Sequence, residues 1–241
     1  NSSREKLTSS TAGIIYHTMK FCDYYSFEYM SLKNKTNVPL LKIETDCTSQ
    51  SEGQLSTRLE AFAETIHAGV NRRKINMKTD GKIYTAGIDS GSTSTDAVIM
   101  DKDAKIIGKA IVPTGSGATN GAKKALAAAL SEAGIEESDL TLTVTTGYGR
   151  ENISFGESSV TEITCHAKGA HYLNPAARTV IDIGGQDSKA IRIDENGAVS
   201  SFVMNDKCAA GTGRFLDMMA RTMELTLDEM GELGLKWKND V

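Results

Sequence analysis

A short motif that occurs twice is the sequence feature that most constrains the fold of this chain. Residues 88–101 and 181–194 align without gaps and share five of fourteen residues, where about one identity is expected by chance from ordinary residue frequencies. In each copy an apolar run ends in an Asp and a Gly-containing turn, and two more strand-like runs follow. The chain therefore uses one unit twice: a strand, a glycine turn, a second strand, a polar turn and a third strand.

The residue pattern also predicts the individual elements. Residues 83–88 and 97–100 read as strands of the first copy, and 179–183 and 189–193 as strands of the second. Three further elements are predicted around the copies: a packed Ala- and Leu-rich helix over residues 120–134, a strand over 141–146, and a last helix that opens with a Thr226–Glu229 capping box.

The two glycine turns suit the phosphates of a nucleotide. Glycine has no Cβ, so its backbone N–H group can approach a phosphate oxygen, and the hydroxyls of Ser92 and Thr93 add donors. Asp89 and Asp182, at strand ends, are candidate ligands of a hydrated Mg²⁺. A simple β-hairpin with a capping Asp is the alternative for either copy alone. The repetition favours a phosphate site, because packing does not require a polar pattern to repeat.

Five segments, in this order, carry a family resemblance: 87–93 (GIDSGST), 146–150 (TGYGR), 162–167 (EITCHA), 182–187 (DIGGQD) and 205–215 (NDKCAAGTGRF). They resemble the activator ATPases of 2-hydroxyacyl-CoA dehydratases, in the BadF/BadG/BcrA/BcrD ATPase family of the actin, sugar kinase and heat-shock ATPase superfamily. The resemblance implies an α/β fold: a ribonuclease-H-like lobe with a mixed sheet and duplicated phosphate-binding hairpins. It also implies ATP and Mg²⁺ as ligands.

The resemblance implies roles for particular residues. The implied phosphate-binding and catalytic residues are Gly91, Ser92, Thr93, Gly184, Gly185 and Gln186, with Asp89 and Asp182 on Mg²⁺, Asp182 also catalytic, and Gln186 orienting the attacking water. In such activators each subunit of a homodimer gives two cysteines to one interface 4Fe-4S cluster, here Cys165 and Cys208. ATP turnover then drives one electron into the dehydratase, with ferredoxin or flavodoxin as donor.

The two cysteines also have a plain interpretation as free, partly buried thiols. The residues after Cys208 have helical character, which predicts its sulfur near a helix N-terminus, where a thiolate is stabilised. His166 is expected to be packed or hydrogen-bonded. Arg150 is expected either to face the nucleotide or a partner, or simply to follow a glycine turn.

Residues 1–66 follow another pattern, with strands expected at 14–16 and 38–43 and a helix at 52–66. Segments 17–23 and 43–55 resemble the C-terminal end of a dehydratase subunit. Residues 1–66 are therefore expected to form a small α/β segment. That resemblance implies that Cys22 is one of three ligands to a dehydratase cluster, the other two lying upstream; Cys47 is expected to be a structural thiol. The basic residues 67–82 predict an exposed linker, and residues 83–241 an activator lobe whose second lobe is missing.

Composition limits the function classes. A net charge of −4 disfavours a nucleic-acid partner despite the basic linker. Four irregularly spaced cysteines, no signal peptide and no apolar run of membrane length predict a soluble protein in a reducing cytoplasm. Three alternatives stay open: an ATPase subunit of the benzoyl-CoA reductase type, a sugar kinase, and a non-catalytic docking module or gene remnant. The residues present suggest a fragment of a fusion protein, which leaves ATP hydrolysis by this piece uncertain.

Overall fold

The computed structural model describes residues 11–19, 23–45, 52–67, 83–115, 117–185, 187–204, 213–236 and 238. Five predicted features lie outside the described residues: Cys22, Cys47, Gln186, Cys208 and linker positions 68–82.

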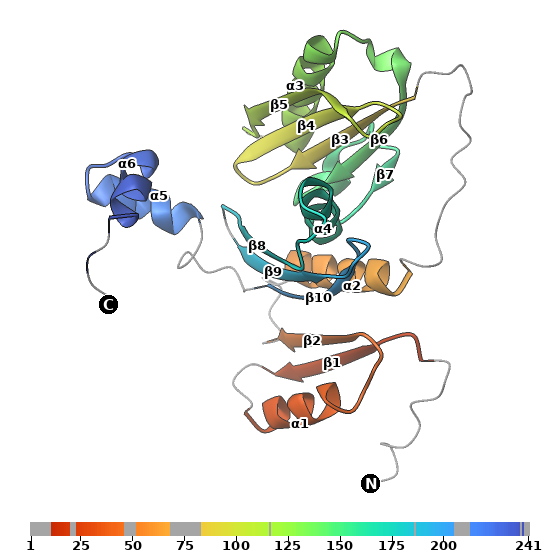
Figure 1. Ribbon diagram of the computed structural model, residues 1–241, viewed down its shortest axis with the longest axis vertical. Coiled ribbons are helices and arrows are strands. Elements are labelled where there is room, and N and C mark those ends of the chain that lie inside the picture. Colours follow the sequence, from red (N-terminus) through yellow and green to blue (C-terminus); the bar gives the residue numbers. More distant parts are fainter. Residues whose placement is uncertain are drawn as a thin grey trace.

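The first copy of the motif lies in a five-stranded mixed sheet (Figure 1). The strands are β3 (Tyr84–Ser90), β4 (Ser94–Met100), β5 (Ile106–Pro113), β6 (Leu140–Thr146) and β7 (Ser158–Ser159). Their order is β5-β4-β3-β6-β7, with β3, β4 and β5 antiparallel and β6 and β7 parallel to their neighbours. This arrangement confirms the predicted α/β fold with a mixed sheet.

Helix α3 (Ala118–Ala133) covers one face of this sheet. Its buried positions recur at helical spacing and meet the fully buried Ile88 and Ile99 of the central strands. The helix ends at Gly134, whose φ of 67° is left-handed and whose N–H group donates to Ser131. The predicted helix and its end are therefore confirmed to within two residues.

The second copy forms a separate antiparallel sheet of β8 (Thr179–Ile183), β9 (Ser188–Ile193) and β10 (Val199–Met204). Helix α4 (Glu162–Leu173), which the residue pattern did not predict, covers one face of it. Ile163 and Ala167 of α4 are fully buried against Ile191 of β9. The duplicated hairpins thus repeat in structure as well as in sequence, one on each sheet.

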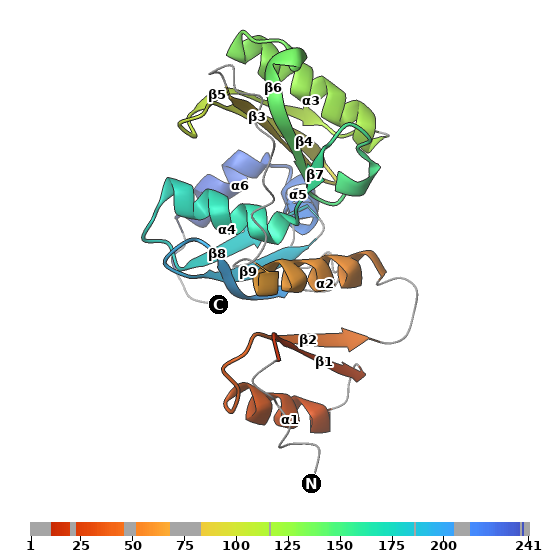
Figure 2. The ribbon, with the colours of Figure 1, turned by 90° about the vertical axis from the view of Figure 1, so that its right-hand side faces the viewer.

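The N-terminal part is a small α/β unit (Figure 2). It contains β1 (Ile14–Met19), α1 (Asp23–Lys33), β2 (Leu40–Thr45) and α2 (Glu52–His67). Strands β1 and β2 are parallel, and α2 packs on them through Phe62, against Leu41 and Ile43. Helix α1 was not predicted, whereas both strands and α2 lie where the sequence placed them.

Four short elements complete the described chain. Two are the 3-10 turns η2 (Glu137–Asp139) and η3 (Arg150–Asn152), and two are the helices α5 (Gly213–Thr222) and α6 (Leu227–Gly234). The Thr226–Glu229 capping box at the start of α6 is confirmed, since each side chain bonds the other's backbone N–H group. Among the described helices, none is both long and apolar enough to cross a membrane.

Candidate active site

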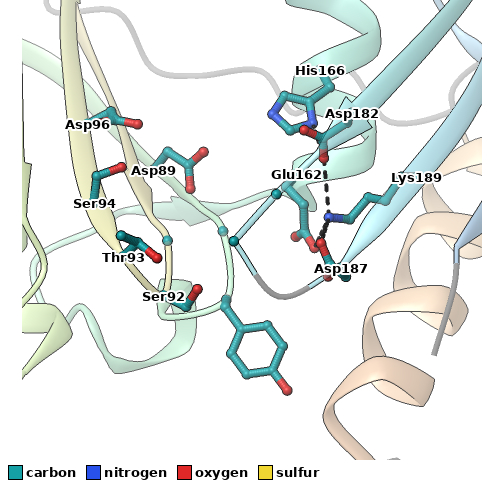
Figure 3. A pocket seen from close by; sticks show the side chains of 15 residues that line it. Asp89, Ser92, Thr93, Ser94, Asp96, Glu162, His166, Asp182, Asp187 and Lys189 are labelled. Atoms are coloured by element: carbon teal, nitrogen blue, oxygen red, sulfur yellow. Dashed lines mark hydrogen bonds and ion pairs between the residues drawn. The ribbon is translucent and has the colours of Figure 1, made fainter. Parts of the chain in front are cut away.

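The two glycine loops meet at one cavity of about 200 Å³ between the two sheets (Figure 3). A Cβ added to Gly185, in the second loop, would lie 2.7 Å from Thr93 Oγ1 in the first. Backbone and hydroxyl groups from both copies therefore face the same space. Seven of the predicted phosphate and Mg²⁺ residues line it: Asp89, Gly91, Ser92, Thr93, Asp182, Gly184 and Gly185.

Asp89 at the end of β3 faces Asp96 of β4 across the antiparallel pair, and both carboxylates line the cavity. Burial raises the pKa of Asp89, His166 acts against this rise, and the negative charges of Asp96, Glu162 and Asp182 add to it. Burial also raises the pKa of Asp96, although a hydrogen bond from Ser94 acts to lower it, and the buried Oδ1 atom of Asp96 has no hydrogen-bond partner among the described residues. These two carboxylates, on paired strands, make this side of the cavity acidic.

The far side of the cavity has its own cation, Lys189 of β9. Its side chain is only 5% exposed, and its Nζ atom lies 2.7 Å from Asp187 Oδ1 and 3.3 Å from Asp182 Oδ2. Glu162 of α4 is a third carboxylate, 4.0 Å away. Burial alone would lower the pKa of Lys189, but these three carboxylates raise it, so the ammonium stays charged beside the glycine loop.

His166 enters the cavity from α4 (Figure 3). Its Nδ1 atom lies 3.3 Å from Asp182 Oδ2, and this contact raises the pKa of His166. Burial acts to raise the pKa of Asp182, but His166 and Lys189 together hold it below its usual value. The sequence predicts only a packed or hydrogen-bonded histidine. The ring of His166 also lines the cavity.

Sequence reasoning missed Asp96, Glu162, Asp187 and Lys189 as site residues. Asp96 could have been found from the sequence, because pairing of the two predicted strands places it opposite Asp89. Lys189 gives a signal as well: it alternates with Ile191 and Ile193 on the buried face of β9, where a lysine requires partners. Glu162 gave no such signal, since helix α4 itself was not predicted.

Cys165 lies on α4 beside His166 as a free, partly buried thiol. Burial raises the pKa of this thiol, and the carboxylates of Glu64, Asp89 and Glu162 raise it too, while Thr146 acts against them. The thiol is therefore neutral unless a positive charge is supplied beside it. No cluster of three or more His, Cys, Asp or Glu side chains that would suit a metal ion occurs within the described ranges.

Arg150 does not line the cavity. It is 5% exposed, donates from Nη1 to Gly147 O at 3.1 Å, and pairs with Glu60 of α2 and Glu162 of α4. The preceding Gly147 does line it, with a φ of 82°. The open question about this segment is thus answered in two parts: the turn contributes to the cavity, and the arginine connects it to α2.

Two family profiles match different parts of the chain. The profile of the BadF/BadG/BcrA/BcrD ATPase family matches residues 86–240, and that of the 2-hydroxyglutaryl-CoA dehydratase D-component matches residues 7–66. The activator of lactoyl-CoA dehydratase from Anaerotignum propionicum is 53% identical over 63% of this chain and 58% of its own length.

Two solved structures are also similar. Component A of the Acidaminococcus fermentans (R)-2-hydroxyglutaryl-CoA dehydratase is 43% identical, with a TM-score of 0.62 over 66% of this chain and 61% of that one. The Clostridium difficile activator of 2-hydroxyisocaproyl-CoA dehydratase, with bound ADPNP, is 42% identical, with a TM-score of 0.60 over 66% and 59%. The chain spans 58 to 59% of the length of the curated activators that it matches.

Proposed function

This chain belongs to the BadF/BadG/BcrA/BcrD ATPase family, and we propose that it is the nucleotide-phosphate part of an ATP-dependent activator of a 2-hydroxyacyl-CoA dehydratase. One observation carries the proposal: two Asp–Gly loops, on separate sheets, line one cavity from opposite sides. A phosphate chain held between two sheets makes contacts to both. Hydrolysis then changes those contacts and with them the angle between the sheets.

The phosphates bind the backbone of both loops and the hydroxyls of Ser92 and Thr93. Lys189 adds a buried positive charge beside the second loop. Tight approach at Gly91 and Gly185 supports this assignment: a Cβ at Gly91 would lie 2.9 Å from the carbonyl of Ser94, and one at Gly185 would point at Thr93. A side chain at either position would collide with these atoms and change the path of the loop.

A Mg²⁺ ion fits the carboxylate side. Mg²⁺ is usually held by one or two carboxylates together with waters and phosphate oxygens, and Asp89 and Asp182 lie on the two loops that line the cavity. The buried, unpartnered Oδ1 of Asp96 and the raised pKa of Asp89 fit a bound cation. When bound, the ion neutralises phosphate charge. Gln186, predicted to orient the attacking water, lies outside the described residues.

The electron-transfer assignment rests on Cys165 and Cys208. Cys165 sits on α4, directly before His166 of the cavity, so a change of nucleotide reaches the helix that carries the thiol. With two such cysteines per chain, a four-thiolate cluster requires a homodimer. When bound, the cluster supplies one-electron chemistry, with ferredoxin or flavodoxin as donor and the dehydratase as acceptor.

Two observations favour a dehydratase over the alternatives. The named relatives activate 2-hydroxyacyl-CoA dehydratases, and residues 7–66 match a dehydratase component in the same chain. A sugar kinase requires a general base beside a sugar hydroxyl and has no use for Cys165 or Cys208. An ATPase of the benzoyl-CoA reductase type would use the same kind of shared cluster. It would differ in the enzyme that receives the electron.

The first experiment is calorimetric titration of the chain with Mg–ADP, for wild type, Asp182→Asn and the exposed control Glu195→Gln. We expect binding by wild type and Glu195→Gln and at least tenfold weaker binding by Asp182→Asn, about 1.4 kcal/mol. Equal affinities would remove Asp182 from the site. In a full-length version, intact ATP hydrolysis by Asp182→Ala would show the catalytic assignment to be wrong.

The second experiment measures iron and acid-labile sulfide after anaerobic reconstitution, with molecular size by light scattering. About two iron atoms per chain in a dimer, lost in Cys208→Ser, is the expected result for a shared 4Fe-4S cluster. Absence of iron in a folded chain that binds Mg–ADP would leave a kinase-like phosphate site without electron transfer.

A further inference from the structure

Helix α2 from the N-terminal unit lies against α4 and next to β10 in both ribbon views (Figures 1 and 2). Ala61 of α2 is fully buried in the same apolar cluster as Ile163 of α4 and Ile191 of β9. Arg58, three residues earlier, donates from Nη2 to Met204 O at 2.8 Å. The contact is therefore a packed interface between the part that matches the dehydratase component and the part that matches the ATPase.

Glu64 of α2 bonds the first turn of α4. Its Oε1 atom accepts from the Thr161 N–H group at 3.0 Å, and its Oε2 atom accepts from the hydroxyls of Thr161 and Thr164 at 2.6 and 2.5 Å. Thr161 is the N-cap of α4, is fully buried, and makes no side-chain cap of its own. Glu64 thus accepts from the N-cap N–H group, as the acidic side chain at N3 does in a capping box, although it comes from another part of the chain.

Glu60, one turn before Glu64, reaches towards the cavity. It pairs with Nη2 of the buried Arg150, whose Nη1 lies 3.4 Å from Glu162 Oε2. The other oxygen of Glu162 lies 4.0 Å from Lys189 Nζ, which lines the cavity. Four groups of alternating charge therefore run from α2 to the phosphate site.

We propose that the ATPase part has a docking surface for an acidic helix, made by Arg150, Thr161 and Thr164, that α2 fills in this chain. We further infer that docking opposes nucleotide binding, an extension that rests on the proposed function. When α2 leaves, Arg150 keeps Glu162 as its main partner and draws it from Lys189. The ammonium is then less neutralised, and the negative charges of Glu60 and Glu64 have left the neighbourhood, so both changes favour an anionic ligand.

Hydrogen exchange of the α2 amides in the whole chain tests the docking without nucleotide. Glu64→Gln and Glu60→Gln are expected to speed exchange in α2 by about tenfold, since hydrogen bonds to charged groups are lost. Glu195→Gln, an exposed charge at the β9–β10 turn, is the matched control and leaves exchange unchanged. Unchanged α2 exchange in Glu64→Gln would overturn the docking surface.

A double-mutant cycle separates this contact from general loosening. Thr164→Val keeps the shape of the side chain and removes only the hydroxyl that donates to Glu64. If Glu64 and Thr164 act as a pair, the α2 amides of the double variant exchange more slowly than the sum of the two single effects would predict. Strictly additive effects would overturn the assigned contact, even if each variant is less stable.

Titration with Mg–ADP tests the coupling. Glu60→Gln is expected to bind about fivefold tighter than wild type, and by reciprocity saturating Mg–ADP weakens docking and speeds α2 exchange in wild type. Equal affinities with normal binding would overturn the coupling and leave the proposed function standing. Absence of binding in every variant would overturn the proposed function and the coupling together, and the nucleotide-free exchange would still decide the docking.

Discussion

Lys189 and Asp182 lie directly opposite one another in the β8–β9 pair, with Nζ and Oδ2 3.3 Å apart. The pair places one buried positive charge next to the aspartate of the second loop. The pair depends on strand register, because a relative shift of one residue would put the two side chains on opposite faces of the sheet. Lys189 is therefore both part of the site and part of the fold.

Lys189→Met tests both roles. It leaves Asp182, Asp187 and Glu162 without their shared cation, and removal of one partner from a buried ion pair typically costs about 3–5 kcal/mol. We expect a lower urea midpoint and loss of Mg–ADP binding. Lys109→Met, on the exposed edge of β5, is the control and leaves both nearly unchanged. Wild-type affinity in a folded Lys189→Met would exclude a role for this lysine in phosphate binding.

His166 leads to a prediction about pH. The contact with Asp182 raises the pKa of His166 in the folded chain. A raised pKa adds stability that is fully present below the unfolded value of about 6.5 and is lost as pH rises through the folded value. The stability difference between wild type and His166→Gln should thus be largest near about pH 6 and shrink at higher pH.

Thermal melting of both proteins across this range is the measurement. Asp182 has a lowered pKa, so its contribution to stability is lost only as pH falls through that lower value. The melting experiments are done at pH values above it, where this contribution is constant. A stability difference that grew between neutral and alkaline pH would contradict the assignment.

The strands of both motif copies could be predicted from the sequence because apolar runs between glycine turns are a local signal. The α3 helix was predictable for the same reason, from its small apolar residues at helical spacing. Helix α1 has aromatic and polar residues without a clear apolar stripe, and α4 mixes glycine, cysteine and histidine into its length. Their helical form depends on tertiary packing, which a local pattern does not contain.

The site divides in the same way. The glycine loops and their aspartates are contiguous motifs, so the seven residues of these motifs that line the cavity could be named from the sequence. Glu162 and Lys189 meet only because α4 packs on β9, and Glu60 reaches Arg150 across 90 residues of chain. The strand pattern can show that Lys189 needs partners, but which residues pair across such distances cannot be read from one sequence.

Gly147 offers a test of the turn that follows β6. Its φ of 82° is left-handed, and an added Cβ would collide with the Asp89 side chain. Gly147→Ala should therefore cost more than the roughly 1–2 kcal/mol of the backbone conformation alone, and weaken Mg–ADP binding by moving Asp89. Gly169→Ala, in open space on α4, is the opposite case and should stabilise by about 0.5–1 kcal/mol. Equal effects would rule out the conformational argument.

The three-stranded sheet provides the last prediction, because its two faces differ sharply. Ile191 of β9 is fully buried under α4 and α2, whereas Ile181 of β8 is 75% exposed on the other face. Ile191→Ala should lower the free energy of unfolding by about 2–5 kcal/mol, and Ile181→Ala by much less. Since Ala61 of α2 packs in the same cluster, Ile191→Ala should also speed hydrogen exchange in α2. Loss of stability without faster α2 exchange would mean that α2 is held by its carboxylates and not by this apolar contact.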